Sequence, residues 1–456
     1  MAYYISRSYK LRVEPWLVFE VLKHERNCFF LDSSLNSNYA QGRYSFLGID
    51  PFFTLKTKNE DPFEKIREIL GKYRISGARP KLPFSGGAVG YLAYDLGLIL
   101  EKKISSKTKV DLGIPDCFFG FYNSIVIIDH IKNLLYIFSI GFPEKSSCLA
   151  KLLAESNFKK IYQLLSKIGL AKNYKKTHGS KVALPQLNSN FTREEYLSAI
   201  KKAKEYIKEG DIYQVNLSQM FNAKSPLSGH DIYQRLRKIS PSYFSAYLDL
   251  GGFQILSSSP ERFLKLEGER VVTCPMKGTR PRSKNRLNDR KLKKELLESA
   301  KDKAELLMIV DLERNDLGRV CSYDSIRVET LRQLEEYSTV FQTTACVQGR
   351  LHKNKDRMDL LRACFPGGSI TGCPKIRAME IIDELEPARR LVYTGSLGYL
   401  SFCGSMDFNI LIRTILKKDN KLYFSVGGGI VADSKPEEEY QETLVKARGM
   451  IEAIGG

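Results

Sequence analysis

Short apolar segments separated by turns make up the first 165 residues of the chain. The segments at residues 43–51, 86–94 and 124–129 are short, apolar and followed by turn residues, which predicts strands. Residues 62–72 and 147–167 carry apolar positions at helical spacing, which predicts two helices. The Lys-, Asn- and Ser-rich residues up to 190 show no period, so we expect a linker over 166–190.

Residues 191–456 carry longer periodic segments. A helix is predicted to begin at Thr192, because Glu195 completes a capping box, and to end at Gly210. Strands and helices do not alternate regularly in this part, which disfavours a doubly wound parallel fold. Further strands are predicted at residues 211–218, 253–257, 262–267, 396–401, 408–416 and 422–426, and further helices at 290–317, 358–363, 375–385 and 437–454.

The composition is that of a folded protein, with 456 residues of which 43% are hydrophobic and 27% charged. No apolar run reaches the ~18 residues that span a bilayer, and the N-terminus lacks the apolar core of a signal peptide. We therefore expect a cytoplasmic protein with no membrane partner. The nine cysteines are spread singly and the five histidines are isolated, which predicts neither a disulfide framework nor a zinc site.

The chain carries 71 Lys and Arg against 52 Asp and Glu, a formal net charge of +19. Nucleic-acid binding is one interpretation of such an excess. The basic residues are, however, distributed through the whole chain, and no Arg-aromatic RNA-binding module is present. We therefore expect no nucleic-acid partner, and a charge that favours an anionic substrate.

A glycine-rich turn with hydroxyl side chains leads into a helix at residues 366–380, which read Pro-Gly-Gly-Ser-Ile-Thr-Gly-Cys-Pro-Lys-Ile-Arg-Ala-Met-Glu. The first turn of that helix carries Pro374 and Lys375. Such a junction exposes backbone N–H groups and suits an anionic ligand. Other stretches of the C-terminal half point to the same site.

Two predicted helices carry carboxylates at a spacing of three residues. Asp302 and Glu305 share one face of the first helix, and Glu439 and Glu442 share one face of the second. Spacing alone favours solvated helix faces. Two helices that both offer carboxylates can instead hold Mg²⁺, which accepts few protein ligands and leaves room for substrate oxygens.

Three shorter stretches offer groups for catalysis or binding. Lys277 is held between Pro275 and Gly278, and is either a turn lysine or a nucleophile or anion contact. Glu261 ends a predicted strand, and is either a surface acid or a general acid with a raised pKa. The amides of Gly427–Gly429 either meet a carboxylate or belong to a loosened hairpin.

Together these stretches resemble the chorismate-utilising enzymes, a family of anthranilate, aminodeoxychorismate, isochorismate and salicylate synthases. The resemblance implies an α+β fold, a large sandwich of two antiparallel β-sheets with helices packed outside. It implies an N-terminal region over 1–165 that adds strands to the same sandwich, and a chorismate-binding catalytic domain over 191–456. The dense part of the resemblance is carried by Gly210-Asp-Ile-Tyr-Gln214, Ser259-Pro-Glu261-Arg-Phe, Pro275-Met-Lys277-Gly-Thr279-Arg, Ala304-Glu305, Arg314-Asn-Asp316, Pro366 through Lys375, Gly395-Ser-Leu-Gly-Tyr399, Ile412-Arg413-Thr414, Gly427-Gly-Gly429 and Tyr440-Gln-Glu442-Thr.

The resemblance also implies roles for individual residues. Glu305 and Glu442 would bind Mg²⁺, with Asp302 and Glu439 close by. Glu261 would be the general acid that protonates the departing C4 hydroxyl of chorismate. Arginine suits the substrate's carboxylates because its planar fork donates two parallel hydrogen bonds. The residues implied in substrate binding are Gln214, Thr279, Ser369, Thr371, Tyr393, Arg413, Gly427, Gly428, Gly429 and Lys446.

Two positions divide the branches of this family. The water-using synthases carry a lysine base where this chain has Gln214, and an amide cannot activate water. Lys277 resembles the aminodeoxychorismate branch, whereas the anthranilate branch has alanine at that position. The resemblance thus implies amination of chorismate at C4 through a covalent adduct of Lys277 at C2, which requires a neutral amine with a lowered pKa.

The chain has no Gly-x-Cys-x-Gly nucleophile stretch, so ammonia is expected to come from a separate glutaminase, and a separate lyase would complete p-aminobenzoate for folate synthesis. One alternative is the anthranilate branch, which shares nearly every feature except Lys277. Another is a non-catalytic ligand-binding relative, which would be expected to have lost acidic residues of the site.

Two further positions bear on the interpretation. Gln342 stands where many family members have histidine, which leaves the contact at that edge of the pocket open. Leu31-Asp-Ser-Ser34 resembles the segment that forms a tryptophan pocket in family members, with Asp32 where anthranilate synthases usually carry Glu. A structural or vestigial pocket fits this segment as well as a regulatory one.

Overall fold

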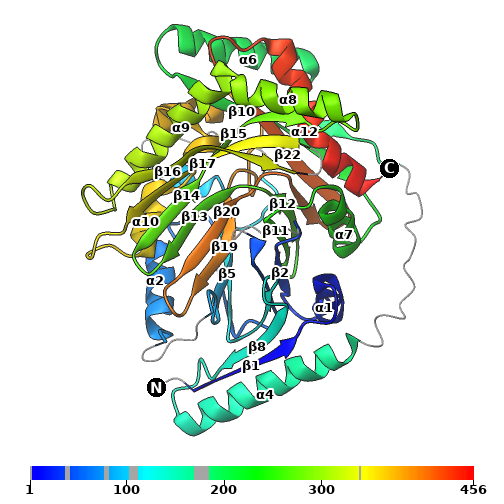
Figure 1. Cartoon of the computed structure of the whole chain (residues 1–456), viewed down its shortest axis with the longest axis vertical. Coiled ribbons are helices and arrows are strands. Elements are labelled where there is room, and N and C mark those ends of the chain that lie inside the picture. The colour runs from blue at the N-terminus through cyan, green and yellow to red at the C-terminus, as the bar shows by residue number, and fades with distance from the viewer. Residues whose placement is uncertain are drawn as a thin grey trace.

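The computed structural model describes residues 3–35, 42–75, 82–101, 111–168, 184–337 and 340–455. Two antiparallel sheets form the centre of the molecule, with helices around them (Figure 1). The expected α+β sandwich is confirmed.

In the first sheet the described strands run in the order β1 (Tyr4–Lys10), β8 (Leu134–Ile140), β7 (Ser124–Asp129), β3 (Tyr44–Gly48), β2 (Phe29–Asp32), β11 (Phe244–Asp249), β12 (Gln254–Ser259), β21 (Thr414–Lys418), β22 (Lys421–Ile430), β10 (Gln214–Lys224) and β18 (Gly372–Cys373), with β9 (Asn188–Ser189) paired to β10.

The second sheet carries the strand that bears Lys277 at its edge. Its described strands run in the order β15 (Met276–Pro281), β17 (Val340–Arg350), β14 (Arg270–Cys274), β13 (Arg262–Glu267), β20 (Met406–Ile410), β19 (Ser396–Ser401), β5 (Gly87–Leu92), β6 (Cys117–Tyr122) and β4 (Phe53–Thr57), with β16 (Arg327–Glu336) paired to β17.

The two sheets face each other across a shared aromatic core. Phe46 of the first sheet contacts Tyr399 of the second with ring centroids 5.4 Å apart, and Phe29 contacts Tyr122 at 4.6 Å. Buried aromatic rings supply much of the hydrophobic stabilisation of such a core. Strands from before residue 165 and from after residue 190 hydrogen-bond in both sheets, so the two parts of the chain share one core.

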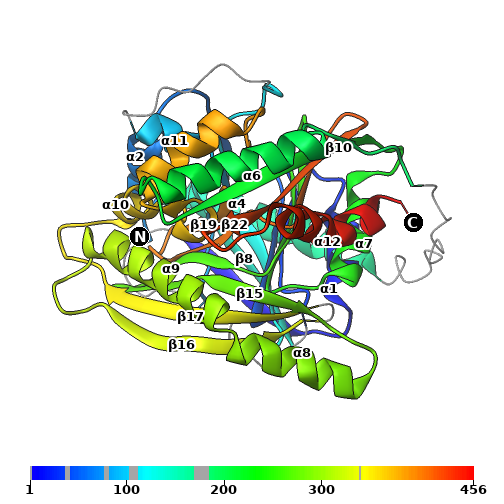
Figure 2. The same cartoon turned by 90° about the horizontal axis from the view of Figure 1, so that it is seen from above.

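Helices cover the outer faces of the sandwich. α4 lies along β1 and β8, whereas α6 and α12 lie side by side near β10 and β22 (Figures 1 and 2). The described helices are α1 (Pro15–Leu22), α2 (Phe63–Lys72), α3 (Leu96–Leu100), α4 (Ser147–Ser166), α6 (Arg193–Lys208), α7 (Gly229–Ile239), α8 (Arg286–Glu298), α9 (Ala300–Gly318), α10 (Arg357–Cys364), the 3₁₀ turn η2 (Gly368–Ile370), α11 (Lys375–Leu385) and α12 (Pro436–Ile454).

The start of α6 follows directly from its sequence. Thr192 accepts the N–H of Glu195, and the Glu195 carboxylate accepts the N–H of Thr192, which completes the predicted capping box. The helix buries Tyr196, Ile200 and Ala203 against β10.

Three expectations differ from the structure. Residues 290–317 form parts of two helices, because Ser299 ends α8 and its hydroxyl caps α9 at the N–H of Asp302. Residues 408–416 belong to two strands, because Arg413 takes a positive φ of 50° and breaks the extended backbone. Of the expected linker, residues 169–183 lie outside the described residues, and residues 188–189 form β9.

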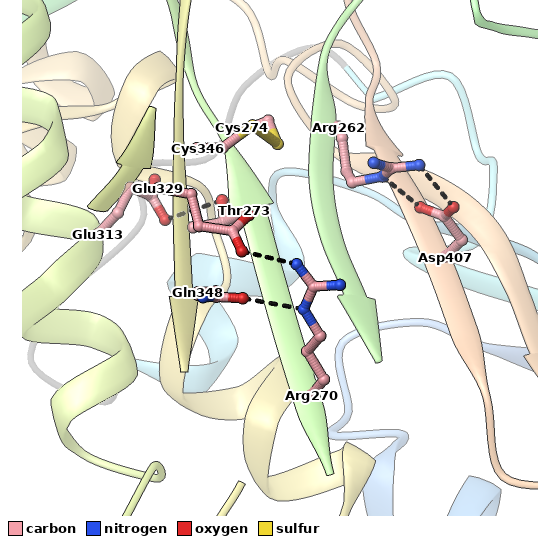
Figure 3. The surroundings of a disulfide bond; sticks show 9 residues. All are labelled: Arg262, Arg270, Thr273, Cys274, Glu313, Glu329, Cys346, Gln348 and Asp407. Atoms are coloured by element: carbon pink, nitrogen blue, oxygen red, sulfur yellow. Dashed lines mark hydrogen bonds and ion pairs between the residues drawn. A yellow bond between two sulfur atoms is a disulfide. The ribbon is translucent and has the colours of Figure 1, made fainter. Parts of the chain in front are cut away.

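The sequence predicted no disulfide framework, but the structure contains a disulfide that the sequence did not indicate. Cys274 at the end of β14 and Cys346 in β17 are joined in a disulfide across two paired strands, with their Cα atoms 4.3 Å apart (Figure 3). The two residues are 72 positions apart in the sequence, so their spacing gave no signal. No helix in the described ranges is long and apolar enough to cross a bilayer.

Candidate active site

The glycine-rich turn at residues 366–375 joins α10 to α11 and lies between two buried carboxyl groups. The Ser369 hydroxyl donates to Glu261 Oε1 at 2.5 Å, and the Gly368 N–H donates to Glu313 Oε1 at 3.1 Å. β18 then pairs with β10, where Cys373 lies opposite Gln214. At Gly368 the backbone N–H therefore binds a carboxyl group of the protein itself.

Glu261 lies between β12 and β13 and is only 4% exposed. Burial raises its pKa from 4.5 to about 7, although the Ser369 hydroxyl, Lys277, the Met276 amide and Arg413 all act in the opposite direction. A carboxyl group that still holds its proton near neutral pH is able to act as a general acid.

Lys277 lies in β15, which pairs irregularly with β17 after this residue. Gly278, at a φ of 73°, bends the strand, and a Cβ there would lie 2.8 Å from Leu296. Removal from water lowers the pKa of the Lys277 ammonium, and the neighbouring Lys446 acts in the same direction. Glu305, Glu261 and Glu442 oppose this shift, so the amine lies among the predicted carboxylates.

Gln214, at the start of β10, has a fully buried side chain. Neither its amide nitrogen nor its amide oxygen has a hydrogen-bond partner in the described part of the chain. A Cβ added at Gly429 would lie 2.7 Å from the Gln214 amide nitrogen and 3.4 Å from Lys277 Nζ. Because buried polar groups are normally satisfied, this amide beside Lys277 favours a ligand at this position.

The glycine run lies inside β22, at the part of this strand that pairs with β10. Gly427, Gly428 and Gly429 lie opposite Ser218, Leu217 and Asn216, respectively. The absence of side chains leaves space along this strand. A Cβ at Gly428 would lie 3.2 Å from Glu439 Oε2 and 3.8 Å from Glu442 Oε1, so the carboxylates of α12 approach the backbone there.

The predicted metal-binding carboxylates lie on α9 and α12, and one acid of each helix approaches Lys301. Lys301 Nζ lies 3.9 Å from Glu305 Oε1 and 4.0 Å from Glu439 Oε1, so one ammonium group stands between acids of both helices. Glu442 forms a 2.7 Å ion pair with Lys446. Asp302 instead accepts a hydrogen bond from Arg280 at 2.9 Å.

This donor set has the chemistry that Mg²⁺ prefers, because it consists of carboxylate oxygens. Burial raises the pKa of both Glu305 and Glu439, whereas the ammonium of Lys446 lowers the pKa of Glu442. Among the described residues no three acidic, His or Cys side chains are close enough to form a metal cluster. The ammonium groups of Lys301 and Lys446 lie next to these carboxylates. The Mg²⁺ site stays a prediction.

Arg413, Gln342 and Thr279 form a chain of hydrogen bonds at another edge of the site. Arg413 donates to the Gln342 amide oxygen at 3.0 Å, and the Gln342 amide nitrogen donates to the Thr279 hydroxyl at 3.4 Å. Burial lowers the pKa of Arg413. Gln342 therefore orients the guanidinium, although the resemblance assigns it no contact with substrate.

The remaining predicted binding residues have partners within the protein. Lys446 donates to the carbonyl of Gly427 at 2.9 Å, and the Thr371 hydroxyl donates to the carbonyl of Gly367 at 3.0 Å. Tyr393 is buried, with the Arg390 guanidinium 5.9 Å from its ring centroid.

Two residues of the site were missed from the sequence. Glu313 is buried at 2% exposure on the core side of α9, and Lys301 lies between the acids of α9 and α12. A signal for Glu313 was present, because it follows Leu306 and Val310 and precedes Leu317 at helical spacing. A carboxylate at a core-facing helix position requires a partner.

A separate cavity of about 540 Å³ lies between the two sheets, away from Lys277 and Glu261. Leu31, Asp32 and Ser33 line it, in agreement with the position expected for the N-terminal pocket. Asp32 accepts a hydrogen bond from Arg237 at 2.8 Å, so its charge is already balanced by the protein.

A family model for chorismate binding enzymes matches residues 27–452 of the chain. The anthranilate synthase component 1 of Acetivibrio thermocellus is 39% identical over 449 residues, which cover 94% of this chain and 90% of the relative. The aminodeoxychorismate synthase component 1 of Escherichia coli (strain K12) is 37% identical over 439 residues, 92% of each chain.

The structure is also similar to that of anthranilate synthase component I from Streptococcus pneumoniae TIGR4. The TM-score is 0.79 at 30% sequence identity, over 96% of this chain and 97% of the other. Relatives of both names thus match nearly the whole chain at similar identity.

Proposed function

The chain belongs to the chorismate binding enzyme family and is a chorismate-utilising enzyme, and on this premise we propose that it aminates chorismate at C4 to give 4-amino-4-deoxychorismate. Similarity to relatives does not separate this activity from anthranilate synthesis, because relatives of both kinds match at 39% and 37% identity. The choice rests on the chemistry of individual side chains.

The observation that carries the proposal is the position of the Lys277 amine. It lies beside the unpartnered Gln214 amide and among Glu261, Glu305 and Glu442. A lysine in such a place is able to act as a nucleophile, because its removal from water lowers the pKa of the ammonium and favours the neutral amine. Gln214 has no basic group, which disfavours activation of water at the same position.

Two displacements account for the product. Lys277 Nζ bonds to C2 of chorismate, the ring double bonds shift, and the C4–O bond breaks as Glu261 gives its proton to the leaving hydroxyl, which departs as water. Ammonia then bonds to C4, the double bonds shift back, and the C2–N bond breaks to release the lysine. Chorismate and ammonia are thereby converted to 4-amino-4-deoxychorismate and water.

Glu305 and Glu442 would hold Mg²⁺, with Asp302 and Glu439 near them. The ion would balance the ring carboxylate of chorismate and withdraw electron density from the ring. Lys301 and Lys446 now supply the positive charge at these acids, and both side chains are long enough to move aside. Arg413, oriented by Gln342, supports binding of a further carboxylate of the substrate.

The ammonia would come from a separate glutaminase component. The relative from E. coli is named component 1, and this chain matches 92% of its length. The name supports a system of more than one component. Free ammonium at high concentration would replace that partner in vitro.

Incubation of the purified chain with chorismate, Mg²⁺ and ammonium tests the proposal. We expect a product that added aminodeoxychorismate lyase converts to p-aminobenzoate. Without ammonium, intact-mass analysis should detect an adduct on Lys277 with the mass of chorismate minus water. Fluorescent anthranilate as the main product would select the other branch, and no consumption of chorismate would select the non-catalytic alternative.

A further inference from the structure

We propose that Glu313 is a positioning residue for the amination reaction. Its carboxyl group connects the strand that leads to Lys277 with the turn that carries Ser369, and so it holds the nucleophile and the general acid in their relative positions. This inference rests on the proposed function, and it concerns a residue that does not touch the substrate.

Two hydrogen bonds define what Glu313 does. Its Oε1 accepts the N–H of Gly368 at 3.1 Å. Its Oε2 accepts the hydroxyl of Thr273 at 3.4 Å (Figure 3). Both partners are neutral donors on segments far from α9 in the sequence. A buried carboxyl group is costly, and it is retained where it satisfies donors that would otherwise be unpaired.

The turn side leads to the general acid. Gly368 is followed by Ser369, whose hydroxyl donates to Glu261 at 2.5 Å. A Cβ at Gly368 would lie 3.1 Å from Glu313 Oε1 and 2.7 Å from Leu312, so only glycine allows α9 to approach this closely. Adjacent residues of one turn therefore bind two buried carboxyl groups, and moving the turn would move Ser369 relative to Glu261.

The strand side leads to the nucleophile. Thr273 lies in β14 and is followed by Cys274, whose disulfide to Cys346 joins this strand to β17 (Figure 3). Three residues after Cys274 the chain reaches Lys277 in β15. Glu313 thus links the cross-linked strand directly to the turn that carries Ser369.

The charged groups around Glu313 do not use it as their partner. Lys375 and Arg319 both donate to Asp316, and each also donates to a backbone carbonyl of α10. Burial, followed by the charge of Asp316, raises the pKa of Glu313 to about 8, whereas Lys375 and the Gly368 amide act in the opposite direction. Glu313 therefore does not serve to balance a cation. Its hydrogen-bond partners are the two neutral donors, the Gly368 N–H and the Thr273 hydroxyl.

The test compares wild type with Glu313→Leu, Glu313→Gln and Ser369→Ala, each assayed with chorismate, Mg²⁺ and ammonium. Glu313→Leu keeps the volume but removes both acceptors, so we expect kcat to fall roughly 10- to 100-fold while KM for chorismate changes less than about twofold. Glu313→Gln retains an acceptor for Gly368 and should recover kcat to within about threefold of wild type.

A pH profile separates positioning from a loss of folded protein. The Ser369 hydroxyl lowers the pKa of Glu261, so its displacement should move the alkaline limb of kcat to higher pH in both Glu313→Leu and Ser369→Ala. The Glu313→Leu/Ser369→Ala double variant should have a kcat within about twofold of the slower single variant, because both changes act through one contact.

Asp116→Asn is the matched control. Asp116 is 4% exposed and accepts the N–H of Asn59 at 2.7 Å, in the part of the second sheet near β4 and β6. Its replacement by asparagine should change neither the value of kcat nor the pH of the alkaline limb in the kcat profile.

Hydrogen exchange supplies a readout that needs no activity. The amide of Gly368 should exchange at least about tenfold faster in Glu313→Leu than in wild type, and near the wild-type rate in Glu313→Gln. Additive effects in the double variant, an unmoved alkaline limb or unchanged exchange at Gly368 would each overturn the role of Glu313. Absence of amination by wild type, with the exchange results as expected, would overturn the proposed function and leave only the structural link.

Discussion

Replacement of Glu261 by glutamine should remove activity and stabilise the protein at the same time. A general acid must hold its proton, and burial raises the pKa of Glu261 from 4.5 to about 7. At pH 7 about half of the groups are then protonated, roughly 150-fold more than at a pKa of 4.5. Glu261→Gln keeps the size of the side chain but has no acidic proton, so kcat should fall roughly 10²- to 10⁴-fold.

The same raised pKa makes Glu261 a destabilising residue at alkaline pH. Between pH 4.5 and 7 the folded chain retains a proton that the unfolded chain has lost, so the free energy of unfolding decreases as the pH rises through this window. The cost is absent below pH 4.5 and complete above pH 7. A shift from 4.5 to about 7 corresponds to about 3 kcal/mol, which Glu261→Gln should recover at pH 8.

Urea unfolding of wild type and Glu261→Gln at pH 5 and pH 8 measures this difference, and kcat between pH 5 and 9 measures the acid. We expect the stability advantage of the variant to grow by about 2 to 3 kcal/mol from pH 5 to pH 8, and the wild-type kcat to fall above pH 7. Glu298→Gln, at an exposed residue of α8, should show no stability advantage that grows with pH and should keep the wild-type kcat profile. An advantage that is equal at both pH values would refute the buried-acid assignment.

Two substitutions test other parts of the site, and a thiol titration tests the disulfide. Lys277→Ala should lose the C4 product, with turnover lowered at least about 100-fold or diverted to the ortho isomer, and unchanged aminodeoxychorismate formation by chromatography would remove the covalent step. Gly429→Ala would place a Cβ 2.7 Å from the Gln214 amide and 3.4 Å from Lys277 Nζ, so we expect kcat to fall at least about tenfold in the same assay; wild-type kcat in this variant would show that the close approach has no effect on Lys277. Thiol titration of the unfolded, unreduced protein should find seven of the nine cysteines free because Cys274 and Cys346 are bonded, and nine free thiols would exclude the disulfide.

The elements that were predicted correctly are those whose signals are local. α11 has the predicted bounds of residues 375–385, and the capping box at Thr192 starts α6 as expected. The division of residues 290–317 was also locally visible, because Ser299 and Asp302 form a helix-start pattern. The helical spacing of apolar residues before and after Ser299 led to the prediction of one continuous helix.

The features that were missed depend on contacts between distant segments. Nothing in the residues around Arg413 predicts a positive φ, which arginine rarely adopts, so the break between β20 and β21 had no local signal. The disulfide depends on the pairing of β14 with β17, which only the folded sheet establishes. The candidate site residues were predicted from short motifs, whereas Glu313 required knowledge of which face of α9 is buried.

The arrangement of α9 explains why one helix serves two parts of the site. Glu305 and Glu313 are eight residues apart, which corresponds to about 12 Å along the axis and a rotation of about 80°. Glu305 lies near Lys277 and Glu439, whereas Glu313 meets the turn at Gly368. Because a helix of 19 residues is stiff over this distance, a displacement of α9 would alter the acids near the nucleophile and the turn beside Glu261 together. The spacing between the proposed metal site and the general acid is therefore set by one rigid element, with glycine at residue 368 allowing the contact.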